Sequence, residues 1–191
     1  MYTKKKSKEL KDVQQLQASA KAFAALLADG SLVTWGSAEA GGDSSAVSQV
    51  RDVQHIQATK WAFAAMSDGS VVTWGHPEAG GDSSAVKDQL RDVRRIQAAD
   101  RAFAAILADG SVVTWGDQSC GGDSSAVQHQ LRNVQQLQAT SYAFSAILRD
   151  GSVVTWGCPV FGGDASAVQS QLSKVRQIQG TGAAFAAILT D

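Results

Sequence analysis

One motif recurs along the chain at nearly constant intervals and limits what it can fold into. Gly-Ser-Val-Val-Thr-Trp-Gly occurs at 69–75, 110–116 and 151–157, with a near copy at 30–36. The tryptophans of these copies are 39, 41 and 41 residues apart. A period of this length is typical of arrays in which each unit buries its apolar surface against its neighbours. Such arrays usually bind partners and seldom catalyse reactions.

The copies divide the chain into a short leading segment and one repeat domain. We expect a basic tail at 1–11, which is either a solvated terminus or a signal that contacts an acidic or nuclear-import surface. Residues 12–191 then form a single repeat domain. Its units are four full repeats and a half repeat, at about 13–52, 53–92, 93–133, 134–174 and 175–191.

Each unit predicts three strands, as the fourth one illustrates. Residues 137–140 alternate apolar and polar side chains, and 143–148 form an apolar run. Asp150-Gly151 is a turn signal because glycine accepts a positive φ without steric cost. The β-branched run at 152–156 completes a hairpin.

The predicted hairpins are apolar on both faces, and this sets the architecture. Phe144, Ala146 and Leu148 share one face of their strand, while the next strand carries valines on both sides. A sheet with one wet face would alternate more cleanly. We therefore expect small sheets sandwiched between others, with alanines allowing close approach and each tryptophan filling the gap between neighbours.

A Gly-Gly-Asp segment follows each hairpin, with its aspartates at Asp43, Asp82, Asp123 and Asp164. The residues after it predict either a short helix of about two turns or an irregular outer strand. A calcium-binding loop needs several oxygen ligands, whereas each of these segments has one carboxylate. The Gly-Lys-Ser/Thr sequence of a phosphate-binding loop is missing. Capping and turn formation explain the segment better.

These observations predict a mainly β repeat protein of propeller-blade or solenoid type. The half repeat at 175–191 contains the first two predicted strands of a unit, which 13–27 already supplies. A closed four-bladed ring would not need both. The array is therefore expected to be open, or incomplete relative to a seven-bladed propeller, with room for one short helix per repeat.

The repeat resembles that of the regulator of chromosome condensation family. The residues that carry the resemblance are Ala139, Ala146, Asp150, Gly151, Val154, Trp156, Gly157 and the segment 162–164. The resemblance covers roughly 13–191. It implies propeller blades and, for the founding members, nucleotide exchange on a small GTPase. The units here are shorter than the family's, and Thr140 and Ala143 replace its usual glycine and histidine, so a fourth strand is in doubt.

Composition excludes several classes of protein. The formal net charge is −1, whereas broad binding to nucleic acid needs a basic face. No apolar stretch is long enough for a membrane span, and no signal peptide is seen. We expect Cys120 and Cys158 to be free thiols, which favours an intracellular reducing compartment.

Propeller order predicts where the loops vary. The turn between the first two strands and the segment after Trp-Gly share one rim, and the Asp-Gly turns share the other. The Asp-Gly rim is nearly constant between repeats, whereas the first rim changes, so the first rim is either a recognition surface or simply tolerant of change. The candidate partner-binding residues on it are Lys21, Lys60, Trp61, Arg101, Tyr142 and Phe161. For Trp61 the alternative is packing across its own loop.

No catalytic set is visible, and no cofactor is expected. His55, His76 and His129 occupy inequivalent places in different repeats, which argues against a metal cluster. The sequence therefore predicts a non-enzymatic protein–protein interaction scaffold. The alternatives are an accessory subunit of a larger, even membrane-associated, complex and an exchange regulator of a small GTPase. The apolar strand at 184–191 lacks its hairpin mate, so we expect the N-terminal repeat, another copy or a partner to cover it.

Overall fold

The chain folds into a row of small antiparallel sheets. The computed structural model describes residues 10–190, and fourteen strands lie within them. The first strands of successive units are β1 (Val13–Ala18), β4 (Val53–Ala58), β7 (Val93–Ala98), β10 (Val134–Ala139) and β13 (Val175–Gly180). The second strands are β2 (Ala22–Leu27), β5 (Ala62–Ser67), β8 (Ala102–Leu107), β11 (Ala143–Leu148) and β14 (Phe185–Leu189). The third strands are β3 (Leu32–Gly36), β6 (Ser70–Gly75), β9 (Val112–Gly116) and β12 (Val153–Gly157).

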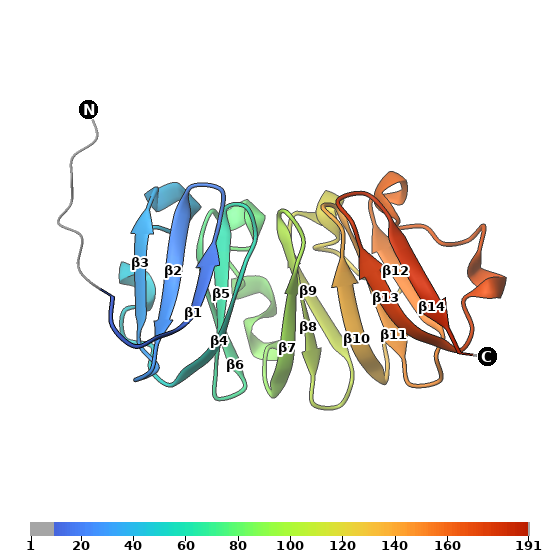
Figure 1. Cartoon of the computed structure of the whole chain (residues 1–191), viewed down its shortest axis with the longest axis horizontal. Helices are drawn as coiled ribbons and strands as arrows, with labels where there is room; N and C mark the ends of the chain where they lie inside the picture. The colour runs from blue at the N-terminus through green and yellow to red at the C-terminus, as the bar shows by residue number, and fades with distance from the viewer. Residues whose placement is uncertain (1–9, 191) are drawn as a thin grey trace.

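Each sheet contains consecutive strands only, and the sheets stand side by side. Four sheets have three strands, in the orders β1-β2-β3, β4-β5-β6, β7-β8-β9 and β10-β11-β12, and the last pairs β13 with β14. The row is open, with the first and last sheets at opposite ends (Figure 1). The expectation of a mainly β, propeller-like and unclosed repeat fold is confirmed.

The Asp-Gly turns have two forms, and the number of residues between the second and third strands decides which form occurs. In the second unit, Asp68 and Gly69 form a two-residue loop with φ of 48° and 73°. The other three complete units have one residue more, and only the glycine there is left-handed, as in Gly151 at φ 81°. Leu148 N–H donates to the Ser152 carbonyl across this longer turn. Both forms suit tight hairpins, because each places glycine where φ is positive.

The core lies between the sheets rather than within one. Phe63 pairs with Trp74 across β5 and β6, and their rings stack at 5.4 Å. They pack on Ala22 and Ala24 of the preceding sheet, and all four side chains are buried. The small alanines therefore let neighbouring sheets approach closely, and the tryptophans fill the gap between them, as the sequence predicted.

The segments between the sheets form 3₁₀ helices instead of α-helices. A turn directly after Trp-Gly was not predicted, and it recurs as η1 (Ala38–Ala40), η3 (Pro77–Ala79), η5 (Gln118–Cys120) and η6 (Pro159–Phe161). The expected helix after Gly-Gly-Asp is present as η2 (Ser45–Val47), η4 (Ser84–Gln89) and η7 (Gln169–Gln171). Only η4 is six residues long, and the third unit has hydrogen-bonded turns there. The outer-strand alternative is wrong for these segments.

The Gly-Gly-Asp segments are turns, as expected. Asp123 Oδ1 accepts the Ser125 N–H at 2.8 Å, and Asp43, Asp82 and Asp164 accept from the residue two places later in the same way. This bond holds the pKa of Asp123 below its usual range. The carboxylates therefore order their own loops.

The two ends of the row expose apolar side chains. At the first sheet Leu16 is 54% exposed, whereas its counterpart Ile56 is fully buried. At the last sheet Ile188 and Leu189 are about half exposed. The N-terminal repeat lies at the far end of the row and does not cover β14 (Figure 1), so that option for the last strand is wrong. No helix in residues 10–190 is long and apolar enough to cross a membrane.

Candidate protein interface

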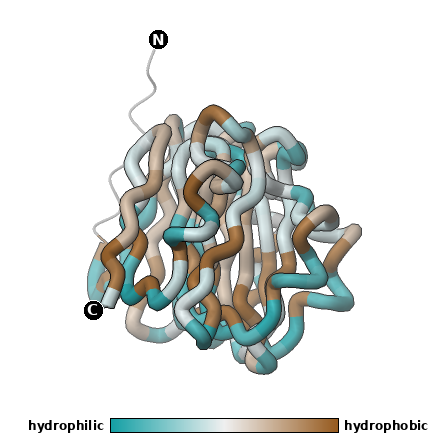
Figure 2. The backbone as a smooth tube through the Cα atoms, turned by 90° about the vertical axis from the view of Figure 1, so that its right-hand side faces the viewer, coloured by the Kyte–Doolittle hydropathy of each residue, from teal (hydrophilic) through white to brown (hydrophobic). Residues whose placement is uncertain are grey.

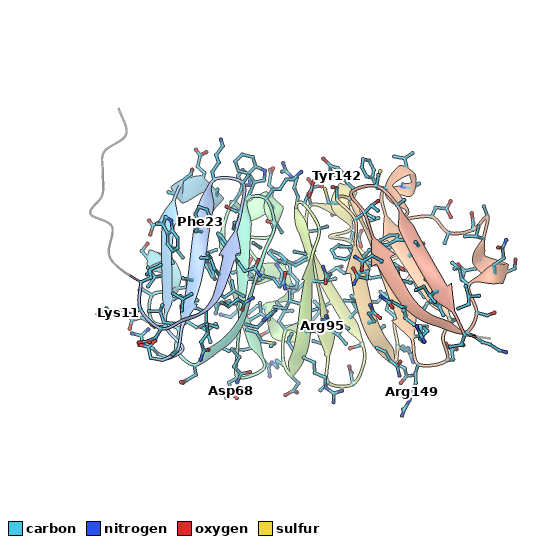
Figure 3. The ribbon with its side chains drawn as sticks, viewed as in Figure 1. Lys11, Phe23, Asp68, Arg95, Tyr142 and Arg149 are labelled. Carbon is cyan, nitrogen blue, oxygen red and sulfur yellow. The ribbon has the colours of Figure 1, made fainter. Side chains whose placement is uncertain are left out.

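The loops form two rims, as the repeat order predicted. We call the first-to-second-strand turns and the segments after Trp-Gly the variable rim, and the Asp-Gly turns the turn rim. Figure 3 shows Tyr142 on the upper, variable rim and Asp68 and Arg149 on the lower, turn rim. All six candidate partner-binding residues lie in variable-rim segments.

Backbone hydrogen bonds hold the two parts of the variable rim together. The first residue after each Trp-Gly donates its N–H to the residue before each second strand. Ser37 bonds to Lys21, His76 to Trp61, Asp117 to Arg101 and Cys158 to Tyr142, at 2.8–3.0 Å. The Thr59 and Thr140 hydroxyls add a second link, because each donates to a carbonyl in the exit segment. The candidate residues therefore stand on a fixed backbone.

A further series of backbone bonds joins one unit to the next along this rim. Ala20 N–H donates to Lys60, Lys60 to Asp100, Asp100 to Ser141, and Ser141 to Gly182, at 2.8–3.0 Å. The five turns thus form one continuous hydrogen-bonded edge. A shallow hollow of about 500 Å³ lies among them, lined by residues from all five units.

Lys21 and Trp61 meet across the first two units. The Lys21 ammonium nitrogen lies 4.9 Å from the Trp61 ring, within the range of a cation–π contact. Trp61 is half-buried and also packs against the core between these units. The contacts of Trp61 therefore reach the neighbouring unit, and neither its partner-binding role nor packing across its own loop is excluded by them.

Lys60 and Arg101 are both paired with carboxylates. Lys60 Nζ lies 2.6 Å from Asp100 Oδ2 in the next unit, and this bond raises the pKa of Lys60. Arg101 Nε lies 3.0 Å from Asp117 Oδ2, close enough for an ion pair but not aligned as a hydrogen bond. Its guanidinium also reaches Glu78 at 3.7 Å. The Ser119 hydroxyl, more than Arg101, holds the pKa of Asp117 low.

Tyr142 and Phe161 form the third cluster. Their ring centroids are 4.6 Å apart in an edge-to-face arrangement. One ring comes from a strand turn and the other from the exit segment of the same unit. The sequence placed these six residues on one rim, but it did not reveal that their pairs form within and between units. Nothing in the sequence marked Asp100, Asp117 and Glu78 as the acidic partners except that they lie in variable segments.

The other groups with chemical potential are dispersed. Across residues 10–190, no three His, Cys, Asp or Glu side chains lie close enough to hold a metal ion. Burial lowers the pKa of His55, whose ring contacts Gln57. Cys120 and Cys158 are both free thiols, and burial raises the pKa of Cys120.

Known structures share this architecture at low sequence identity. Human WBSCR16 matches with a TM-score of 0.62 and 15% identity over 92% of this chain. Yeast RCC1 (Prp20), solved with Kap60, matches with a TM-score of 0.61 and 14% identity over 93% of this chain. The ectodomain of the Arabidopsis thaliana receptor kinase ACR4 matches with a TM-score of 0.55 and 16% identity over 93% of this chain.

The chain spans 59%, 54% and 61% of those three structures, respectively. No protein-family model matches the sequence. No curated protein matches it either. Similarity at this level of identity establishes the fold alone, and the chain therefore has an RCC1-like, propeller-type repeat fold.

Proposed function

We propose that the chain is a non-enzymatic scaffold that binds a partner protein on its variable rim. The observation that supports this most is the contrast between the two rims. The turn rim repeats nearly the same Asp-Gly sequence in every complete unit, whereas the variable rim changes in sequence on a backbone that is hydrogen-bonded within and between units. Loops that vary on a fixed scaffold are the usual place for recognition.

The side chains on this rim suit a protein surface. They combine half-buried aromatic rings with charges of both signs, and each charge already has an oriented neighbour. Tryptophan, tyrosine and arginine are the residues that most often anchor protein interfaces. Because the ring and ion pairs are formed in the free protein, less side-chain entropy is lost when a partner binds.

Paired variants test the proposal. The partner is first identified by mass spectrometry of the native complex, and its capture is then measured with purified variants. We expect Trp61→Ala with Arg101→Ala to weaken capture at least about tenfold, as for interface anchors. Arg149→Ala, on the turn rim, is the matched control and should bind normally.

Folding must be separated from binding, because Trp61 also packs against the core. Thermal melts should show a modest decrease for the double variant. Lys60→Gln with Arg101→Gln removes two rim charges without placing a carboxylate beside Asp100 or Asp117, so it should weaken capture while the melt stays close to that of the wild type. Normal capture by both rim variants would overturn the proposal.

Two alternatives remain distinct from this proposal. The resemblance of the repeat to the regulator of chromosome condensation family makes exchange on a GTPase worth one test, and yeast Prp20p has been characterised for binding to Gsp1p and histones. Accelerated release of a fluorescent guanine nucleotide from a GTPase panel would support that function. An accessory-subunit role would instead give a stoichiometric assembly whose other members become unstable when this chain is removed.

A further inference from the structure

A groove on the turn rim, between the fourth and fifth units, concentrates positive charge. Its volume is about 520 Å³, and the turn of the fourth unit and the start of β13 line it. We call it the basic groove, after the three residues Arg149, Lys174 and Arg176 in its lining. Figure 2 looks onto this end of the row, where hydrophilic stretches lie along the lower, turn-rim side.

The three basic side chains are exposed and have no acidic partner. No ion pair within residues 10–190 includes any of them. Among the described residues, one carboxylate lines the groove, that of Asp150, and its Oδ1 accepts from the N–H and the hydroxyl of Ser152. The groove therefore has an excess of positive charge that the described part of the chain does not neutralise.

The earlier places where two units meet on this rim have the same backbone. In each, the first valine of a first strand donates its N–H to the turn glycine of the preceding unit. The pairs are Val53 to Gly30, Val93 to Gly69, Val134 to Gly110 and Val175 to Gly151, at 2.8–3.1 Å. Side chains at these places can therefore be compared directly.

The same comparison shows that the charge is peculiar to the basic groove. The counterparts of Arg149 are Ala28 and Ala108, and the shorter turn of the second unit has none; those of Lys174 are Asp52, Asp92 and Asn133; those of Arg176 are Gln54, Arg94 and Gln135. Arg94 is the one basic residue among them. All three places are basic only between the fourth and fifth units, among the residues described.

Lys174 has a backbone conformation that disfavours lysine. Its φ is 56°, and the residues at equivalent places have φ of 53–57°: Asp12, Asp52, Asp92 and Asn133. Aspartate and asparagine tolerate this region because their short side chains bond locally. The Lys174 carbonyl is fixed by Thr190, whose N–H and hydroxyl donate to it at 2.9 and 3.0 Å. A disfavoured residue that the fold does not require is typical of a functional position.

A glutamine in the groove is suited to contact an extended backbone. At the equivalent place in the first unit, the Gln15 amide accepts from the Ile56 N–H at 2.9 Å and donates to the Ile56 carbonyl at 2.8 Å. Gln136 is the counterpart of Gln15 and lines the basic groove. Its side chain forms no hydrogen bond with another residue in 10–190, so its amide is available to a ligand.

The surroundings favour an acidic peptide over nucleic acid. Among the described residues, no aromatic side chain lines the groove, whereas single-stranded nucleic acid is usually held by stacking on aromatic rings. The turns of the other complete units carry Asp29, Asp68 and Asp109 on the same rim. These carboxylates would repel a phosphate backbone that extended along the rim, whereas the charges of a peptide can be confined to the groove.

We propose that the basic groove binds an extended, acidic segment of a second partner protein. Carboxylates of the segment pair with Arg149, Lys174 and Arg176, and the Gln136 amide bonds to its backbone. Clusters of arginine commonly recognise acidic motifs, because the guanidinium donates two parallel hydrogen bonds to a carboxylate. The groove lies on the rim opposite the variable rim, so this ligand is distinct from the partner bound there.

A model peptide tests the site. A labelled decapeptide of alternating glutamate and threonine presents its carboxylates on one side when extended. It is titrated into the full chain and followed by fluorescence anisotropy. We expect saturable binding, and a peptide with glutamine in place of glutamate should bind at least about tenfold more weakly, on the scale of several exposed ion pairs. Equal binding of the two peptides would overturn the proposal.

Arg176 and Arg94 give a matched pair of variants, because they occupy the same place in different units. Arg176→Gln should weaken binding about threefold, the scale of one exposed ion pair. Arg94→Gln removes the same charge from the protein but lies outside the groove lining, so it should leave binding nearly unchanged. Equal losses would overturn the proposal, because they would indicate attraction by the overall charge alone.

Lys174→Asn separates a ligand-binding role from a structural one. Asparagine suits the backbone there, so the variant should melt at a higher temperature than the wild type. It should nevertheless bind the acidic peptide about threefold more weakly, as expected for the loss of one ion pair. Unchanged peptide affinity would overturn the proposal, because Lys174 would then have no part in binding.

An oligonucleotide distinguishes the other polyanion. A labelled ten-nucleotide strand of thymidylate is titrated under the same salt conditions as the peptide. Weaker binding of the strand than of the peptide supports the proposal. Tighter binding that Arg176→Gln reduces would overturn it, because nucleic acid would then be the better ligand of the groove.

Discussion

Trp156 donates its indole N–H to the carbonyl oxygen of Gly121, 3.0 Å away in the preceding unit. The same bond joins the second unit to the first and the third to the second. Trp35 lies in the first sheet of the row that the structure describes and is 37% exposed. The stability of a repeat array is close to a sum over units and their interfaces. Substitutions at equivalent positions therefore measure one interface at a time.

Trp156→Phe should destabilise the chain, whereas Trp35→Phe should not. The first change removes a buried hydrogen bond and leaves a carbonyl unsatisfied, at a cost of about 1–3 kcal/mol. The second removes an indole whose N–H has no acceptor among residues 10–190. Urea denaturation of both variants checks this, and equal losses would show that the indole bond contributes little.

Gly121→Ala should be strongly destabilising. Gly121 has φ of 86°, and an added Cβ would lie 2.6 Å from the Phe144 ring. Left-handed backbone costs a residue with a side chain about 1–2 kcal/mol before any clash. Gly182→Ala is the control, because the nearest atom to its added Cβ is 3.8 Å away. A melting temperature that falls equally for both would contradict the packing described for Gly121.

Lys174→Asn should stabilise the chain, and Asn133→Lys should destabilise it. Both residues precede a first strand and have φ of 56°. Asparagine tolerates the left-handed region better than lysine does, because its side chain bonds locally. We expect opposite shifts in melting temperature, each worth about 0.5–1 kcal/mol on the scale of compatible backbone substitutions. Shifts of the same sign would show that side-chain contacts dominate at these positions.

Stability should decrease as the pH falls below about 4, the usual aspartate range. In the turns, the hydroxyl and N–H of Ser111 and Ser152 bond to Asp109 and Asp150 and lower the pKa of each carboxyl. A carboxyl with a lowered folded pKa stabilises the fold above its unfolded pKa and loses that contribution as the pH falls through the folded value.

Melting temperatures between pH 6 and pH 2 test this dependence. Ser111→Ala with Ser152→Ala keeps the carboxylates but removes the hydroxyl donors, so its melting temperature should change less with pH than that of the wild type. Parallel curves for the two proteins would contradict the role given to these turns.

Local pattern made most of each unit predictable from sequence. Alternation located the strands, Asp-Gly located the hairpins, and the spacing of Trp156 and its counterparts indicated packing between units. The first two features depend on neighbours a few residues away, and the third depends on the repeat period. The 3₁₀ turn after Trp-Gly was missed, because its four copies at 38–40, 77–79, 118–120 and 159–161 differ in sequence and share no pattern.

The candidate interface was predictable as a rim but not as a set of contacts. Variation between repeats selected Lys60 and Trp61 without showing what they touch. Their partners, Asp100 and Lys21, lie about one repeat away in sequence and meet them only because the units are bonded edge to edge. The basic groove likewise requires a structure, since Arg149 and Lys174 belong to different predicted strand ends and meet only where two units pack.

Hydrogen–deuterium exchange of the chain with its captured partner tests the central claim most directly. The account predicts slowed exchange in the variable rim, at 19–21, 37–40, 59–61, 76–79, 99–101, 117–120, 140–142, 158–161 and 181–184. The turn rim, including 149–151, should exchange as in the free protein. Protection confined to the turn rim, or none on the variable rim, would contradict the assignment of that rim as the protein interface.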